Sequence, residues 1–109
     1  MSAEVTVTNH PEASRYEARA GEELAGFVGY ELTDGLITFT HTRVQPAYEG
    51  RGIGGAIVRA ALDDVAADGT REVVPLCPFV QRWIDRHPDY RRLVHRATPS
   101  ATGRPATPE

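Results

Sequence analysis

Over residues 5–44, apolar and polar side chains alternate with a period of two, the pattern of half-exposed β-strands. Val5 and Val7 alternate with threonines and predict a short first strand. Residues 15–20 alternate in the same way and predict a second strand. The segment between them, residues 9–14 with Pro11, is typical of a turn.

The clearest pair of strands covers residues 24–32 and 36–44. Asp34 and Gly35 lie between them and supply the positive φ angles that a tight hairpin requires. The first four elements are therefore predicted to form an antiparallel meander.

After Gly52 the apolar period becomes helical. The stripe consists of Ile53, Ile57, Val58, Ala61, Leu62 and Val65. Gly69 is expected to end the helix in a left-handed conformation. Residues 72–76 form a short apolar strand, and a right-handed crossover would place it parallel to residues 36–44.

A second helix is predicted from Pro78, which suits a first helical position, to Pro88, which stops it. Its inner face would consist of Phe79, Val80, Trp83, Ile84 and His87. Residues 1–96 are expected to form one α/β (α+β) domain, and residues 97–109, which have no apolar period, a flexible tail.

The net charge of -3, without a block of like charges, does not favour nucleic acid or an anionic membrane as a partner. No apolar run is long enough to span a bilayer, and residues 1–9 lack the order of a secretory signal. The single cysteine fits a reducing cytoplasm, where we expect the protein to act. All basic residues are arginines, which excludes a phosphate-loop or Schiff-base lysine.

Residues 44–55, Val-Gln-Pro-Ala-Tyr-Glu-Gly-Arg-Gly-Ile-Gly-Gly, predict a strand that enters a glycine-rich bend and then a helix. Such a bend directs unpaired N–H groups outward at the positive end of the helix dipole, an arrangement that binds phosphates. Both predicted helix starts follow the carboxyl ends of parallel strands, so they would meet at one edge of the sheet.

Gly50, Gly52 and Gly55 match the spacing G-x-G-x-x-G of dinucleotide-binding proteins. That fold expects the glycines after the first strand and an acidic residue at the end of the next one. Here antiparallel strands come first, and Glu72 begins its strand. A plain tight turn is the other structural explanation of these glycines.

The same bend resembles the acyl-CoA loop of the GNAT superfamily of N-acetyltransferases, Gln/Arg-x-x-Gly-x-Gly/Ala. The core of the loop is matched by Gly52, Ile53 and Gly54, and its approach by Val44, Pro46 and Tyr48. The order of elements over residues 4–95 also resembles that of the superfamily. The pattern's opening Gln/Arg position is Glu49 here, which is a departure.

The chain more closely resembles the minimal, Yjdj-type branch of small acetyltransferases, which lacks helices between the first two strands. His41-Thr42, Cys77-Pro78-Phe79 and His87-Pro88 match segments of that branch.

The resemblance implies that acetyl-CoA is bound. The four histidines and the single cysteine show no metal-ligand spacing, so no metal is expected. The pantetheine arm would pair with backbone near Arg43 and Val44, between the parallel strands as they splay apart. The diphosphate would lie on N–H groups from Gly50 to Gly55, with Arg51 nearby. The implied cofactor-binding set is Arg43, Val44, Glu49, Gly50, Arg51, Gly52, Ile53, Gly54, Gly55, Arg82 and Arg86.

Two residues are candidates for catalysis. Cys77 is either a small buried hydrophobe or, at a helix N-terminus that enhances thiol reactivity, a nucleophile or an assistant in direct transfer. His41, expected on the strand face of Ile37 and Phe39, is either a core histidine or a general base that also orients Cys77. Arg82 and Arg86 are either solvated or reach the 3′-phosphate of CoA.

We therefore predict an N-acetyltransferase that moves an acetyl group from acetyl-CoA to an amine. An open acceptor side favours a protein lysine, a protein N-terminus or a small amine such as a polyamine. The alternatives are a CoA-binding module with little or no turnover, and a structural domain that binds no CoA.

Overall fold

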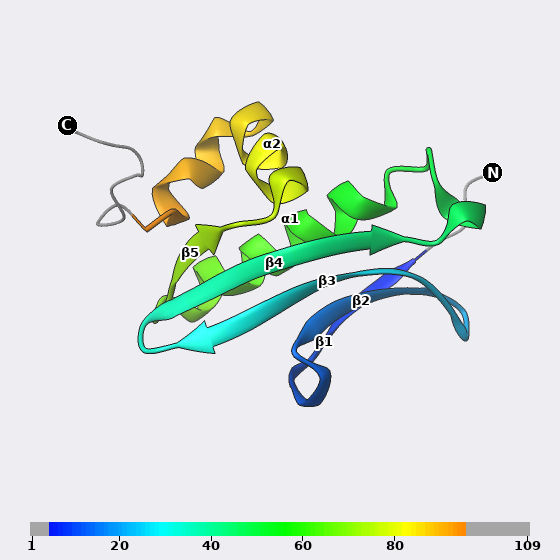
Figure 1. The fold of residues 1–109 in the computed structure, drawn as a ribbon, viewed down its shortest axis with the longest axis horizontal. Helices are drawn as coiled ribbons and strands as arrows, with labels where there is room; N and C mark the ends of the chain where they lie inside the picture. The colour runs from blue at the N-terminus through cyan, green and yellow to red at the C-terminus, as the bar shows by residue number, and fades with distance from the viewer. Residues whose placement is uncertain (1–4, 96–109) are drawn as a thin grey trace.

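The computed structural model describes residues 5–95 as one five-stranded sheet with helices (Figure 1). In chain order the elements are β1 Thr6–His10, η1 Pro11–Ala13, β2 Arg15–Ala20, β3 Glu23–Thr33, β4 Leu36–Val44, η2 Pro46–Tyr48, α1 Ile53–Asp68, β5 Glu72–Pro75, α2 Pro78–Arg86 and η3 Pro88–Leu93. The strands lie in the order β1-β2-β3-β4-β5, with only β5 parallel to its neighbour. The predicted meander, crossover helix and parallel strand are confirmed, while the predicted tail 97–109 lies outside the described residues.

Two details of the meander differ from expectation. β1 includes Asn9 and His10, which were predicted in the turn, because they pair with the start of β2 and because the Tyr30 hydroxyl donates to Asn9. In the β3–β4 hairpin only Gly35 has a positive φ, +72°. Asp34 does not share that conformation.

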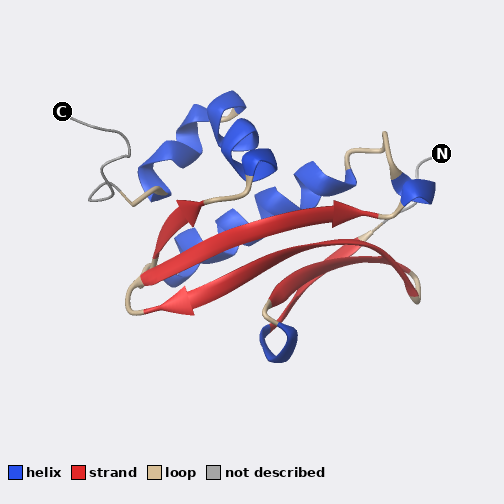
Figure 2. Cartoon of the chain, viewed as in Figure 1, coloured by secondary structure: helices blue, strands red, loops and turns tan. Residues whose placement is uncertain are grey.

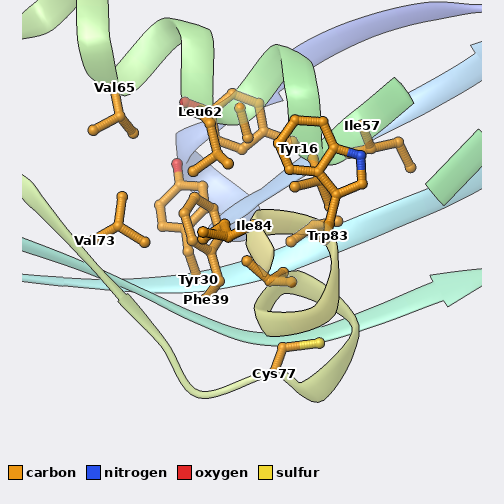
Figure 3. Close-up of a cluster of buried hydrophobic side chains, with 14 of the residues drawn as sticks. Tyr16, Tyr30, Phe39, Ile57, Leu62, Val65, Val73, Cys77, Trp83 and Ile84 are labelled. Carbon is orange, nitrogen blue, oxygen red and sulfur yellow. The ribbon is translucent and has the colours of Figure 1, made fainter. Parts of the chain in front are cut away.

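Both helices pack on the same face of the sheet (Figure 2). Val28 and Phe39 of the sheet lie beside Val58 and Ala61 of α1 and Val80 of α2, and all of them are buried. Tyr16 and Tyr30 extend this core beneath α1 (Figure 3). The hydrophobic stripe of α1 therefore forms from the positions that its helical period predicted.

Within residues 5–95, no helix covers the opposite face of the sheet. Glu17 projects from that face and is still only 4% exposed, because the guanidinium groups of Arg15 and Arg19 close over it at 2.7 and 3.0 Å. Arg15 also lies over the ring of Phe27. Charged side chains thus shield this face where helices do not.

A β-bulge in β4 changes which of its side chains point toward the helices. Gly29 pairs with His41 and Tyr30 pairs with Phe39, so Thr40 is an extra residue that reverses the alternation. Phe39 and, after the bulge, Thr42 face the helices, whereas His41 is exposed on the opposite face. The prediction that His41 shares a face with Ile37 and Phe39 is therefore wrong.

The end of the described chain packs along β5. α2 ends at Arg86 and Pro88 opens η3, after which Val94 forms an isolated bridge to Val73. The N–H of His95 donates to Val73 at 2.8 Å, and its imidazole contacts Glu72. No helix among residues 5–95 is long and apolar enough to cross a membrane.

Candidate acyl-CoA site

The glycine bend begins after η2 and ends where α1 starts at Ile53. Gly50 and Gly52 have φ angles of +81° and +77°, which L-residues adopt only with strain. A Cβ atom built at either position would meet nothing within 4 Å, so the bend is not filled by side chains.

Within residues 5–95, the amide N–H groups of residues 50–55 make no backbone hydrogen bond of normal geometry; the first such bond that follows runs from the N–H of Ala56 to the carbonyl of Gly52. The positive end of the α1 dipole lies behind them. Beside the bend is an open hollow of about 200 Å³ that is lined by Val44, Tyr48, Glu49, Gly50, Gly52, Ile53, Gly54, Gly55 and Phe79. This arrangement suits an anion with several oxygen atoms.

Gly54 and Gly55 have a packing reason to be glycine. A Cβ on Gly54 would come within 2.8 Å of the Phe79 ring, and one on Gly55 within 3.3 Å of the Trp83 indole nitrogen. These contacts bring the start of α2 against the start of α1. The two predicted helix starts therefore do meet at one edge of the sheet.

β4 and β5 separate beside the bend. Their pairing runs from Leu36 to Phe39, and the last contact is the N–H of Cys77 donating to Phe39 at 3.0 Å. From residue 40 to residue 44, the outer edge of β4 has no partner within the described chain. Because Gln45 donates to Ala25, strand alternation directs the backbone groups of Val44 toward this free edge.

The same alternation directs the backbone of Arg43 toward β3, opposite Phe27. Of the two residues expected to pair with pantetheine, only Val44 therefore presents its backbone groups at the free edge. The side chain of Arg43 is exposed on the face away from the helices.

Cys77 is the residue before α2 and is 4% exposed (Figure 3). Its Sγ lies 3.3 Å from the Oγ1 of Thr42, which comes from the part of β4 that β5 has left. The side chain of Cys77 does not cap α2. A hydroxyl and a thiol thus meet at the inner end of the split between the strands.

The structure does not bring His41 to Cys77. The His41 ring lies edge-on to Phe27, with 5.5 Å between ring centroids, and its Nδ1 is 3.1 Å from the Oγ1 of Thr40. It also covers Gly29, where a Cβ would lie 2.7 Å from its Cε1. The neighbouring residue, Thr42, occupies the position expected for His41, and the sequence motif contained both.

The candidate arginines come from different elements, and only one of them lies in the bend itself. Arg51 is in the bend, with its guanidinium carbon 5.6 Å from the Tyr48 ring centroid. Arg82 and Arg86 are exposed on α2 and do not line the hollow. Arg59, one turn beyond Gly55, was not singled out from the sequence, and it lies over the Trp83 ring at 5.3 Å.

Within residues 5–95, no group of three or more His, Cys, Asp or Glu side chains is arranged to hold a metal ion.

The strand order, the split between two parallel strands and the glycine bend beside it define the fold class of the GNAT superfamily. The model of the GCN5-related N-acetyl-transferase family matches residues 15–93, and the chain therefore belongs to that family. No curated protein matches the sequence.

Solved structures with the same fold include a GCN5-like protein from Staphylococcus aureus, at 15% identity and a TM-score of 0.64, with 95% of this chain and all of that chain covered. A ribosomal-protein-alanine N-acetyltransferase from Brucella melitensis biovar Abortus 2308 is 20% identical, with a TM-score of 0.55 and 84% and 68% of the two chains covered.

A GNAT-family protein from Desulfovibrio desulfuricans is 23% identical over 56% of this chain, with a TM-score of 0.49. This chain spans 41% of the length of that relative.

Proposed function

We propose that this protein transfers the acetyl group of acetyl-CoA to an amine, with the donor's diphosphate bound by the glycine bend. The observation that carries the proposal is the set of N–H groups from residues 50–55, which make no backbone hydrogen bond of normal geometry in the described chain and belong, Arg51 excepted, to residues that line an open hollow. Family membership supports acetyl transfer in general.

The donor would extend from this hollow along the free edge of β4. The backbone groups of Val44 are available there to an amide of the pantetheine arm, and the split leads from the bend toward Cys77. Arg51 adds a positive charge beside the diphosphate. Arg82 and Arg86 remain candidates for a more distant phosphate contact.

At the inner end of the split, the acetyl thioester would meet Thr42 and Cys77. In direct transfer, the amine nitrogen bonds to the acetyl carbon, the carbon–sulfur bond of the thioester breaks, and the amine's proton passes to the departing sulfur. In the two-step route, the Cys77 sulfur first bonds to the acetyl carbon, the carbon–sulfur bond of the thioester breaks, and the proton of the Cys77 thiol passes to the departing sulfur, so that CoA leaves as its thiol. The amine then attacks the acetyl-cysteine. The Thr42 hydroxyl lies 3.3 Å from the Cys77 sulfur, and in both routes it would donate a hydrogen bond to the sulfur on which negative charge develops.

The acceptor is proposed to be an exposed amine, on a protein or on a small molecule such as a polyamine. Between β1 and β2 the described chain has only η1. No pair of longer helices there would restrict the space in which an acceptor amine approaches. The net charge of -3 agrees with a cationic acceptor.

The test is calorimetric titration with acetyl-CoA, followed by intact-mass measurement of the protein and of a panel of amines. Gly52→Ala and Gly69→Ala form a matched pair, since both glycines flank α1 at φ near +75° with open space around them. Both variants should lose similar stability, but only Gly52→Ala should weaken acetyl-CoA binding, by about tenfold or ~1.4 kcal/mol.

An acetyl adduct that Cys77→Ser abolishes would select the two-step route, and acetylated amine without an adduct would select direct transfer. Binding without any acetyl transfer would instead identify a CoA-binding module. No binding, or equal weakening in both glycine variants, would contradict the proposal.

A further inference from the structure

Tyr48 joins the approach to the bend to the start of the neighbouring strand, β3. Its hydroxyl donates a 2.7 Å hydrogen bond to Oε1 of Glu23, the first residue of β3. The Tyr48 ring is buried and lines the hollow, with the Arg51 guanidinium over it. The accepting Glu23 carboxylate raises the pKa of Tyr48, so the hydroxyl keeps its proton at neutral pH.

One backbone bond, from the N–H of Gln45 to the carbonyl of Ala25, ties the start of this segment to β3. The backbone bonds of η2 are local, from Tyr48 to Gln45 and from Glu49 to Pro46. The bond between Tyr48 and Glu23 is the side-chain hydrogen bond that links residues 46–55 to another element of the described chain. At the end of the bend that leads into α1, the chain is held by the packing of the buried Ile53 and of Gly54, which lies against the Phe79 ring.

The N–H groups of the bend have no backbone partner within the described chain, so hydrogen bonds within the bend do not hold its conformation. Several N–H groups bind one diphosphate well only if they converge on it before it arrives, because ordering them on binding costs affinity. The entrance to the bend must therefore be fixed by its neighbours. It is held to β3 at two points, by the backbone bond from Gln45 to Ala25 and, nearer the bend, by the side-chain bond from Tyr48 to Glu23.

We propose that Tyr48 and Glu23 are positioning residues, whose hydrogen bond holds the bend in the conformation that binds the diphosphate of coenzyme A. This inference rests on the proposed function and deepens it. Neither residue is assigned a part in the transfer itself.

The test compares binding of coenzyme A with binding of pantetheine, which lacks the diphosphate. Tyr48→Phe removes the donor and Glu23→Ala removes the acceptor, whereas Glu23→Gln keeps an acceptor oxygen. Tyr30→Phe is the matched control, because it removes an equivalent bond, to Asn9 at 2.7 Å, at the other end of the sheet.

Tyr48→Phe and Glu23→Ala should each raise the Kd for coenzyme A about fivefold. Neither should change the Kd for pantetheine, and the double variant should be no weaker than either single one. Glu23→Gln and Tyr30→Phe should bind coenzyme A like the unmodified protein.

An unchanged Kd for coenzyme A in Tyr48→Phe and Glu23→Ala would overturn this inference alone. Equal weakening toward both ligands would also overturn it, since that result indicates general disruption of the fold. If the unmodified protein did not bind coenzyme A, the proposed function would fail, and this inference with it.

Discussion

Thr42 is the side chain that defines the surroundings of Cys77. Its Oγ1 lies 3.3 Å from the Sγ of Cys77. Thr42 comes from β4 and Cys77 from the residue before α2, at the point where the chain after β5 leaves β4. A hydroxyl in this position can donate to a sulfur that carries negative charge, either that of Cys77 or that of a departing thiolate. The hydroxyl therefore acts where charge develops in the proposed transfer.

Replacing Thr42 by valine keeps the shape of the side chain and removes the hydroxyl. We expect Thr42→Val to lower kcat about tenfold, the loss of one hydrogen bond to a charged sulfur, and to change the KM for acetyl-CoA little. Steady-state kinetics with an identified amine acceptor measure both constants. Thr38→Val, on the same strand but outside the split, is the control. An unchanged kcat in Thr42→Val would remove the hydroxyl from the mechanism.

The position of Cys77 could be predicted from the sequence, whereas the position of Thr42 beside it could not. Pro78 marks a helix start, so Cys77 could be placed at the end of β5 and before α2. The choice between His41 and Thr42 depends on Thr40, the extra residue opposite Gly29 and Tyr30. A bulge of this kind has no local sequence signal here, because its cause lies in the pairing of β4 with β3.

At the scale of single elements, the face of the sheet away from the helices is stabilised by charge. Glu17 of β2 accepts hydrogen bonds from Arg15 and Arg19 on its own strand. Desolvation raises the pKa of Glu17, but these two hydrogen bonds, together with the charges of Arg15 and His10, outweigh it and hold the pKa below the usual 4.5. The carboxylate therefore stays ionised in the folded state down to lower pH than in the unfolded chain.

This depressed pKa predicts an acid-dependent loss of stability. The contribution of Glu17 is complete above the unfolded-state value near 4.5 and is lost as pH falls through the lower folded-state value. Glu17→Gln should cost about 1 kcal/mol at neutral pH, since Arg15 and Arg19 are themselves partly exposed and the pair is screened.

Urea denaturation at a series of pH values measures this effect. Between neutral pH and values below 4.5, the unfolding free energy should fall less steeply in Glu17→Gln than in the unmodified protein. Parallel curves would show that Glu17 is not the titrating group.

At the scale of the whole molecule, the site results from the meeting of two helix starts with one split in the sheet. The right-handed crossover through α1 places β5 beside β4, and the contacts of Gly54 with Phe79 hold the two helix starts together. Where β5 leaves β4, the glycine bend, the free strand edge and the Thr42–Cys77 pair lie in succession.

Much of this arrangement could be predicted because the sequence signals are local. The glycines of the bend, the period of α1 and Pro78 each define an element boundary that the structure contains. The contacts of Arg59 with Trp83 and of Tyr48 with Glu23 could not, since each joins side chains from separate elements. The distances between these side chains depend on how the elements pack, and the hydrophobic period of a sequence does not show that packing.

The most direct test of the account is a titration of ¹⁵N-labelled protein with coenzyme A, followed by NMR of the backbone amides. We predict that the largest shift changes fall on the amides of residues 50–55, and that pantetheine, without the diphosphate, leaves those amides unchanged while it perturbs Val44 and Cys77. Shift changes from coenzyme A that leave residues 50–55 unaffected would contradict the claim that this bend binds the acyl donor.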